Sequence, residues 1–293
     1  MTVAHVDSAS DPRLAPYLEV RDRDALGPDG RPGLFVGESP LVIEAMLRAP
    51  VETLSILASD RQEARARALL EAARPSRAGR PDPDILLAPD EVLDAAVGFN
   101  IHRGFLAIGR RPAPRSVRDV VPASGDCLLL VVEDVNNIDN IGQLFRNAAA
   151  FGCAAVVLSP ACHDPLYRKS LRVSCGHALR VPFARSASWA DDLAWLREGA
   201  GLALVGATGG ADRTLAETAE ELARTSPRRV AVLVGAEFDG LTPAALGACS
   251  HPTRIPMAPG VDSLNVGVAA GVFLARLAEA RGDHPPARVQ VTG

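Results

Sequence analysis

Four runs of β-branched and leucine residues constrain the fold of this chain most strongly. They read CLLLVVE at 127–133, CAAVVLS at 153–159, GLALVGAT at 201–208 and RRVAVLVG at 228–235. A loop with Gly, Asp or Asn and then a helical pattern follows each run. Uninterrupted runs of this kind are typical of strands buried on both faces of a parallel sheet. Ligands bind at the carboxyl ends of such strands, so the loops after them are the place to look for a site.

The region upstream predicts a second, smaller α/β unit. GLFVGESPLVIEAML at 33–47 reads as a strand and then a helix, and VETLSILAS at 51–59 as a strand before a helix over about 60–74. GRRPAPRSVRDVVPASG at 109–125 is rich in proline and arginine, which favours a linker. We therefore predict an N-terminal domain over 1–112, a linker over 113–124 and a C-terminal domain over 125–293.

The composition is that of a soluble globular protein. The chain has 293 residues, 47% of them apolar, and a net charge of −4. It has no apolar run near the roughly 18 residues of a membrane span and no apolar block near its start, so we expect a cytoplasmic protein with no membrane contact. Five cysteines without a CxxC pair, and six histidines that do not stand at metal-ligand spacing from them, predict reduced thiols and no metal site.

Three loops after the predicted strands carry polar residues that turns and caps alone do not require. In NNIDNIGQLFRNAAAFG, 136–152, a helix begins near Asn140 and carries Arg146; in VGAEFDGL, 234–241, Gly235, Glu237 and Gly240 follow a strand. IPMAPGVDSLNVGVAAG, 255–271, precedes a mostly apolar helix. None contains the glycine pattern of a dinucleotide or P-loop site.

Each of these residues also has a simple structural explanation. Asn140 could cap its helix, Arg146 could be a surface cation, and the glycines could serve only a turn. Ser263 could cap the last helix, which leaves Asn265 without a role. The case for function depends on all three loops following strands of one sheet.

These loops resemble the motifs of the SpoU (TrmH-like) branch of the SPOUT RNA methyltransferases. The motifs N-x-G-x-x-x-R, G-x-E-x-x-G and P-M-x-x-x-x-x-S-L-N-V are met here by three sets of residues: Asn140, Gly142 and Arg146; Gly235, Glu237 and Gly240; and Pro256, Met257, Ser263, Leu264, Asn265 and Val266. The resemblance covers about 127–281. More loosely, the upstream part, including GFNIHRGFLAIG at 98–109, resembles a small RNA-binding domain similar to a ribosomal-protein fold.

The resemblance implies a parallel α/β catalytic domain with a deep trefoil knot, completed by pairing into a homodimer. It implies S-adenosyl-L-methionine as methyl donor, held largely by backbone groups. The cofactor positions are Thr208, Gly235, Ile255, Met257 and Leu264, and the catalytic positions are Asn140, Arg146, Glu237, Ser263 and Asn265. Glu237 would brace the loops through backbone amides, and Gly267 and Gly271 would allow close packing of the last helix against a neighbour such as a second subunit.

Arg146 is described in the family as a general base, but a guanidinium with a pKa above about 12 stays protonated. We therefore expect Arg146 to position the RNA and stabilise negative charge. RNA contacts are expected first from Arg168, Lys169 and Arg172 in YRKSLR, and then from Arg103.

The resemblance implies ribose 2′-O-methylation, and we expect ribosomal RNA as the substrate. A transfer-RNA 2′-O-methyltransferase and a catalytically silent RNA-binding scaffold of the same fold are the alternatives. A nicotinamide-dependent oxidoreductase is a third reading, but it lacks a glycine fingerprint after the first strand.

Overall fold

The computed structural model describes residues 2–18, 33–98, 104–225, 228–237 and 239–282. The chain forms two compact units. The first contains Met1–Ala113 together with Asp164–Arg180, and the second contains Pro114–His163 together with Val181–Gly293. The segment Asp164–Arg180, which we assigned to the C-terminal domain, therefore groups with the N-terminal unit.

The N-terminal unit is built on a mixed sheet in the order β1-β4-β3-β5-β2. Its strands are β1 (Val3–His5), β2 (Leu34–Glu38), β3 (Thr53–Ser59), β4 (Asp84–Ala88) and β5 (Phe105–Arg110). Strands β1, β4 and β3 are parallel, and β5 runs antiparallel to both β3 and β2. The predicted strands at 33–38 and 51–59 are thus present, in a sheet that buries Leu57, Leu86 and Ile108.

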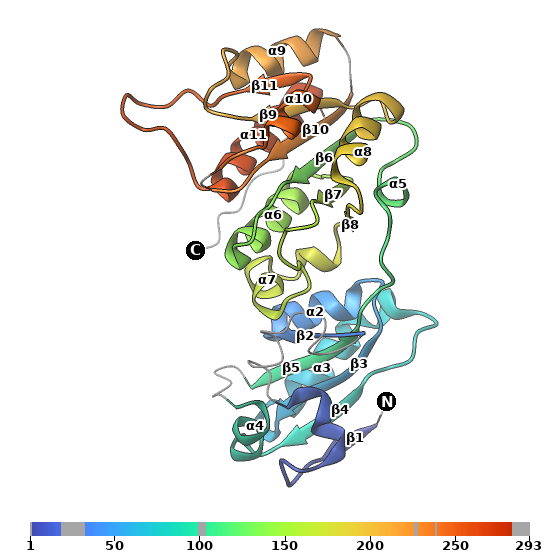
Figure 1. Ribbon diagram of the computed structural model, residues 1–293. Helices are drawn as coiled ribbons and strands as arrows, with labels where there is room; N and C mark the ends of the chain where they lie inside the picture. Colours follow the sequence, from blue (N-terminus) through green and yellow to red (C-terminus); the bar gives the residue numbers. More distant parts are fainter. Residues whose placement is uncertain (1, 19–32, 99–103, 226–227, 238, 283–293) are drawn as a thin grey trace. The chain divides into compact units, whose positions relative to one another are not determined.

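Helices surround this sheet (Figure 1). They are η1 (Pro12–Tyr17), α2 (Pro40–Arg48), η3 (Asp60–Gln62), α3 (Glu63–Ala73), η4 (Arg74–Arg77) and α4 (Asp90–Val97). The segment from later in the chain adds α7 (Arg168–Val173) and η5 (His177–Leu179). Proline at the first position of α2 is favourable there, because the first amide of a helix has no partner within it.

The C-terminal unit contains a sheet in the order β11-β9-β10-β6-β7-β8, and every pair in it is parallel. Its strands are β6 (Cys127–Val132), β7 (Ala155–Leu158), β8 (Phe183–Arg185), β9 (Ala203–Ala207), β10 (Arg229–Val234) and β11 (His251–Thr253). The four predicted runs form β6, β7, β9 and β10. All six residues of β6 are buried, as strands covered on both faces require. The prediction of a parallel α/β domain is confirmed.

Helices pack on this sheet and bury its apolar residues. They are α5 (Val117–Val120), α6 (Ile138–Ala150), α8 (Trp189–Ala194), η6 (Trp195–Gly199), α9 (Leu215–Thr225), α10 (Pro243–Ala248) and α11 (Val266–Arg281). The long helix α11 contacts α6, α9 and β10. The predicted linker is partly folded: Ser116 and Asp119 form a capping box at α5, and Val117 and Val120 join the core of the C-terminal unit.

The described residues contain neither a membrane-spanning helix nor a cluster of metal ligands. No helix among them is long and apolar enough to cross a membrane. They contain no group of three or more His, Cys, Asp or Glu side chains placed to hold a metal ion. All five cysteines are free, and only Cys175 is not buried.

Candidate active site

A cavity of about 390 Å³ lies in the C-terminal unit, between the loops that follow β9 and β10 and the long loop between β11 and α11. The five positions assigned to the cofactor all line it: Thr208, Gly235, Ile255, Met257 and Leu264. Glu237 and Ser263 line it too. Its size is within the roughly 300–1,000 Å³ of small-molecule sites, and its lining mixes apolar side chains with glycine backbone, as such sites do.

The loop after β10 is closed so tightly that only glycine fits at position 235. A Cβ atom there would lie 2.1 Å from the carbonyl oxygen of Gly240 and 2.5 Å from the backbone nitrogen of Leu241. The loop is closed by a hydrogen bond of 3.0 Å from the Gly240 N–H to the Ala236 carbonyl. Gly240 has a φ of +65°, a conformation that favours glycine. Both glycines of the second motif therefore have a steric reason to be there.

Three side chains, one from each loop, meet in a hydrogen-bonded cluster. The Nδ2 atom of Asn140 donates to Oε1 of Glu237 over 2.6 Å. The Nδ2 atom of Asn265 donates to the same Oε1 over 3.0 Å and to Oδ1 of Asn140 over 2.9 Å. Glu237 thus accepts from two side-chain amides rather than from the backbone amides we expected. The cluster joins α6, the β10 loop and the start of α11.

Asn265, and not Ser263, caps α11. Its Oδ1 atom accepts from the backbone N–H groups of Gly267 and Val268 over 2.9 and 3.3 Å. Ser263 lies two residues before the cap, is exposed, and contacts Oδ1 of Asp262 at 3.5 Å. Asn137 similarly caps α6, which leaves Asn140 in the first helical turn. Asn265, which would have no role if Ser263 were the cap, therefore serves as both cap and cluster member.

The two glycines at the start of α11 face α6 of the same chain. A Cβ atom on Gly267 would lie 2.4 Å from Oε1 of Gln143, and one on Gly271 would lie 3.3 Å from Nδ2 of Asn147. The Nδ2 atom of Asn147 donates to the Gly267 carbonyl over 2.6 Å. The close neighbour of this helix is thus α6, and the suggestion that the glycines serve a second subunit is not needed.

Arg146 lies on α6 but apart from the polar cluster. Six residues separate it from Asn140, roughly 9 Å along a helix. Its side chain is exposed, and among the described residues no contact joins it to Asn140, Ser263 or Asn265.

The residues predicted to bind RNA differ in how far their side chains are exposed to solvent. Arg168 is paired with Glu38 within the N-terminal unit, and its side chain is only 11% exposed. Arg172 contacts the same carboxylate at 2.7 Å but remains 43% exposed. Lys169 is partly buried. Arg168 is thus not the exposed cation that we expected, and Arg103 lies outside the described residues.

Glu133 is a positioning residue that the sequence analysis missed. It is 2% exposed, directly follows β6, and donates its backbone N–H to the Val234 carbonyl over 2.9 Å. Its carboxylate accepts from the Thr242 N–H at 2.8 Å, the Thr242 hydroxyl at 2.9 Å and Nε1 of Trp189 at 2.6 Å. One residue therefore holds both ends of the loop between Val234 and Thr242, which lines the cavity. A lone glutamate after an apolar run gave no signal of this in the sequence.

Replacing Glu133 with glutamine is expected to weaken ligand binding in the cavity about tenfold and to lower the thermal midpoint. The glutamine amide would place an N–H donor opposite the donor groups of Thr242 and Trp189. The buried polar group that is then left without a partner costs about 1–3 kcal/mol. Calorimetric titration with S-adenosylmethionine and thermal unfolding measure the two effects. Glu198→Gln, at an exposed glutamate of η6, is the control. An unchanged affinity of Glu133→Gln for S-adenosylmethionine would show that Glu133 does not position the cavity loop.

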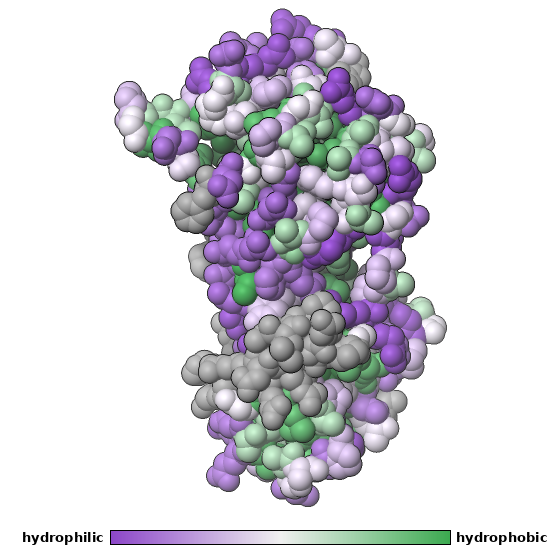
Figure 2. Space-filling view, in the orientation of Figure 1, coloured by the Kyte–Doolittle hydropathy of each residue, from purple (hydrophilic) through white to green (hydrophobic). Residues whose placement is uncertain are grey.

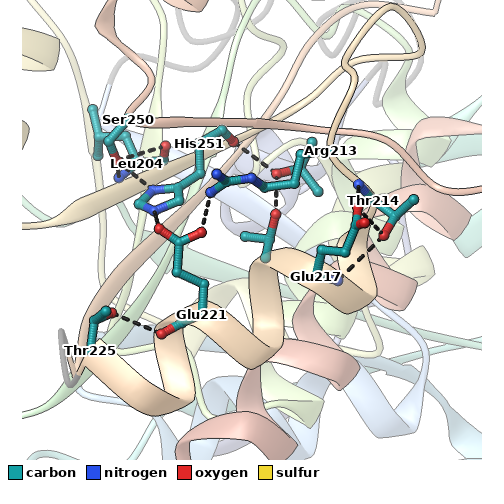
Figure 3. Close-up of polar contacts among 10 residues, drawn as sticks. Leu204, Arg213, Thr214, Glu217, Glu221, Thr225, Ser250 and His251 are labelled. Carbon is teal, nitrogen blue, oxygen red and sulfur yellow. Dashed lines mark hydrogen bonds and ion pairs between the residues drawn. The ribbon is translucent and has the colours of Figure 1, made fainter.

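A second polar cluster fixes β11, the strand that leads to Ile255 (Figure 3). The Nδ1 atom of His251 lies 2.8 Å from the Ser250 hydroxyl, and its Nε2 atom lies 3.6 Å from Oε1 of Glu221 on α9. Arg213 pairs with the other oxygen of Glu221. Burial lowers the pKa of His251; Glu221 opposes this shift, and Arg213 adds to it. The folded unit therefore favours the neutral imidazole.

This lowered pKa predicts a loss of stability in acid. Because unfolded His251 takes up a proton more readily than folded His251, its contribution is complete above a pH of about 6.5 and is lost as the pH falls toward the folded pKa. Thermal midpoints measured between pH 7.5 and pH 5 should fall less steeply in His251→Gln than in the unchanged protein. Parallel curves would show that His251 does not contribute.

Comparisons with known proteins agree with this geometry. Residues 127–275 match the model of the SpoU rRNA Methylase family. An uncharacterized tRNA/rRNA methyltransferase of Mycobacterium tuberculosis is 39% identical over 275 residues, 93% of this chain and 90% of the relative. The 23S rRNA (guanosine-2′-O-)-methyltransferase RlmB of Escherichia coli is 31% identical over 193 residues, 65% of this chain and 76% of that protein.

Solved structures show the same fold. The crystal structure of an RNA 2′-O ribose methyltransferase superposes with a TM-score of 0.73 at 26% identity, covering 95% of this chain and 99% of the other. An rRNA methyltransferase from Sinorhizobium meliloti gives a TM-score of 0.73 at 22% identity, covering 95% and 98%. The family match spans the cavity and all three loops. The chain therefore belongs to the SpoU rRNA methylase family.

Proposed function

We propose that this protein transfers a methyl group from S-adenosyl-L-methionine to a ribose 2′-hydroxyl of RNA. The observation that carries the proposal is the meeting of Asn140, Glu237 and Asn265 beside a cavity lined by all five predicted cofactor positions. Membership of the SpoU family and the names of its relatives support the reaction.

The cavity fits the proposed cofactor in its chemistry. Ile255, Met257 and Leu264 offer apolar walls, and Gly235 and Gly240 leave backbone groups open to the edge of a base. When bound, S-adenosylmethionine supplies a methyl group made electrophilic by its sulfonium. The chain must then place the ribose oxygen in line with that methyl group and help the hydroxyl lose its proton.

Asn140 and Asn265 hold the three loops at fixed spacing through Glu237, so the substrate ribose meets a rigid site. Ser263, exposed at the cavity, is placed to contact that ribose. Arg146 contributes a permanent positive charge. It would bind the phosphate next to the target ribose and stabilise the developing alkoxide. The proton then leaves to solvent or to another acceptor, since a guanidinium cannot take it.

Ribosomal RNA is the proposed substrate, because the Escherichia coli relative named above acts on 23S rRNA. Transfer RNA is the alternative, supported by the tRNA/rRNA wording of the mycobacterial relative's name. Mapping 2′-O-methyl sites across total RNA from cells with and without the gene separates these cases. Loss of a ribosomal site is expected, and loss of no site would favour a silent scaffold.

We also propose that two copies pair through the face formed by α11 and the loop before it. Of the five exposed large hydrophobic residues in the described part of the chain, four are here: Val261, Leu264, Val268 and Val272, which are 40–51% exposed. Val268 and Val272 are one turn apart on α11, and Leu264 also lines the cavity. In Figure 2, hydrophobic and hydrophilic residues are intermixed on the face in view. A second copy over these residues would shield them from water and adjoin the site.

Val268→Glu is expected to convert the dimer to a monomer and to lower methyl transfer at least tenfold, because a buried unpaired charge opposes pairing. Light scattering coupled to gel filtration measures the mass. Leu41→Glu changes the one remaining exposed large hydrophobic residue in the described chain, which is 53% exposed on α2, and should leave the mass unchanged. A monomeric unchanged protein would contradict the pairing.

We propose that the loop between β11 and α11 takes part in a trefoil knot. Membership of the family supports this proposal, and so does the sheet order, in which β11 pairs with β9 at the edge and does not pair with β10, the strand before it in the chain. The N-terminal unit would bind RNA, with Arg172 of α7 as an exposed cation. The protein is proposed to act in the cytoplasm.

A further inference from the structure

A second cavity, of about 580 Å³, lies in the N-terminal unit and takes no part in the proposed methyl transfer. It is formed by the end of α2, the start of β3 and the turn after α3. Three arginines line it, Arg48, Arg77 and Arg80. The only carboxylate in the lining is Glu52, whose Oε2 atom is bound by Nε of Arg110 at 2.6 Å.

Arg77 is the unusual residue of this cavity. It is 4% exposed, yet its Nε and Nη1 atoms are buried without a hydrogen-bond partner in the described part of the chain. The nearest carboxylate oxygen, Oδ1 of Asp82, lies 4.0 Å from Nε. Burial lowers the pKa of Arg77, and the charge of Arg80 lowers it further, while Asp82 opposes both. The Nη2 atom of Arg77 donates to the Pro81 carbonyl over 2.5 Å, so this buried cation is only partly compensated, and such a charge is costly.

Thr53, Arg80 and Arg48 also line this cavity. The hydroxyl of Thr53 is buried and unpartnered among the described residues. Arg80 donates to the carbonyls of Ala49, Val51 and Ser76, and these bonds hold its guanidinium at the wall of the cavity. Because a guanidinium has five N–H groups, some of them remain available to a ligand. Arg48 is exposed at the rim and paired with Glu44 on its own helix. Pro50 and Pro81 add apolar surface.

We propose that this cavity binds the phosphate group of a nucleotide. A phosphate would supply a negative charge beside Arg77 and accept hydrogen bonds from guanidinium groups of the lining, a geometry for which arginine is suited. The volume exceeds that of a phosphate alone, and the prolines offer a surface for the attached sugar or base. The nucleotide is either one unit of an RNA strand or a free mononucleotide, and both present the same group to the site.

The test begins with thermal unfolding of the full chain in sodium phosphate, with sodium chloride at matched ionic strength as reference. Phosphate should raise the midpoint of the unchanged protein and of Arg67→Met, which removes an arginine of α3 that does not line the cavity. Arg77→Met should raise the dissociation constant for phosphate at least about tenfold, the loss expected for a charged hydrogen bond. Equal protection of Arg77→Met, or no protection of the unchanged protein, would overturn the proposal.

Arg48→Met is a second test of the site that can be used if Arg77→Met does not fold. Its surface ion pair with Glu44 contributes little to stability, so this variant should fold and still bind phosphate at least twofold more weakly. Unchanged phosphate affinity in folded Arg48→Met, with Arg77→Met unfolded, would also overturn the site.

A second arm identifies the source of the phosphate. The dependence of binding on salt is measured with a fluorescent single-stranded RNA. Loss of one phosphate contact in Arg77→Met should lower the slope of log affinity against log salt by about 0.7, whereas Arg67→Met should not. A lower slope assigns the site to the RNA strand. An unchanged slope, with phosphate binding still lost in Arg77→Met, assigns it to a free nucleotide. Failure of methyl transfer alone would leave these results intact.

Discussion

Gly235→Ala is expected to lower the affinity for S-adenosylmethionine by a factor of about 100 or more, because displacements near 1 Å in a fitted site have effects of that size. The new methyl group would lie 2.1 Å from the Gly240 oxygen and 2.2 Å from the Gly240 carbonyl carbon, both backbone atoms that cannot rotate away. The loop must therefore open, and with it one wall of the cavity. Calorimetric titration of the purified protein measures the affinity.

Gly247→Ala is the matched control for this substitution. Gly247 lies in α10, and a Cβ atom there would meet nothing within 4 Å. Alanine favours a helix over glycine, so this variant should bind the cofactor normally and unfold at the same or a slightly higher temperature. Normal binding by Gly235→Ala would show that the tight loop does not form the cofactor site.

Arg146→Ala is expected to reduce the rate of methyl transfer by about 100- to 1,000-fold, the usual effect of removing a group that stabilises charge in the transition state. S-Adenosylmethionine affinity should hardly change, because Arg146 does not line the cavity. Arg146→Lys should recover part of the rate. Its rate should follow the same pH profile as the unchanged protein, since the charge acts without giving up a proton.

The pH profile separates this role from general-base catalysis. If Arg146→Lys regained activity with a new apparent pKa near that of a lysine, about 10.4, the residue would be acting as a base. Arg224→Ala, at an exposed arginine of α9, controls for the loss of one positive charge and should leave the rate unchanged.

The sequence predicted the parts of the fold that have strong local signals. The runs that form β6, β7, β9 and β10 are apolar throughout. Such runs are typical of strands that are buried on both faces of a parallel sheet. Strands β1, β8 and β11 have three residues each, too few to show a period. Composition placed a linker where Val117 and Val120 in fact join the core, because proline marks a break in regular structure but not exposure.

The site residues were predictable as types but not in their contacts. The resemblance selected Asn140, Glu237 and Asn265, and the structure joins them by hydrogen bonds that spacing along 125 residues could not reveal. Ser263 was preferred as the cap because serine caps helices as well as asparagine does, and only the backbone geometry decides between them. Glu133 was missed because a single buried carboxylate has meaning only through the groups that it accepts from.

Methyl transfer to ribose in RNA can be measured directly with the purified protein. Purified protein is incubated with ribosomal RNA and S-adenosylmethionine carrying a labelled methyl group, and the RNA is digested to nucleosides and analysed by mass spectrometry. We expect the label in a 2′-O-methylated nucleoside, and its absence when Asn140→Ala is used. Label found only on a base, or no transfer to RNA by the folded protein, would contradict the claim.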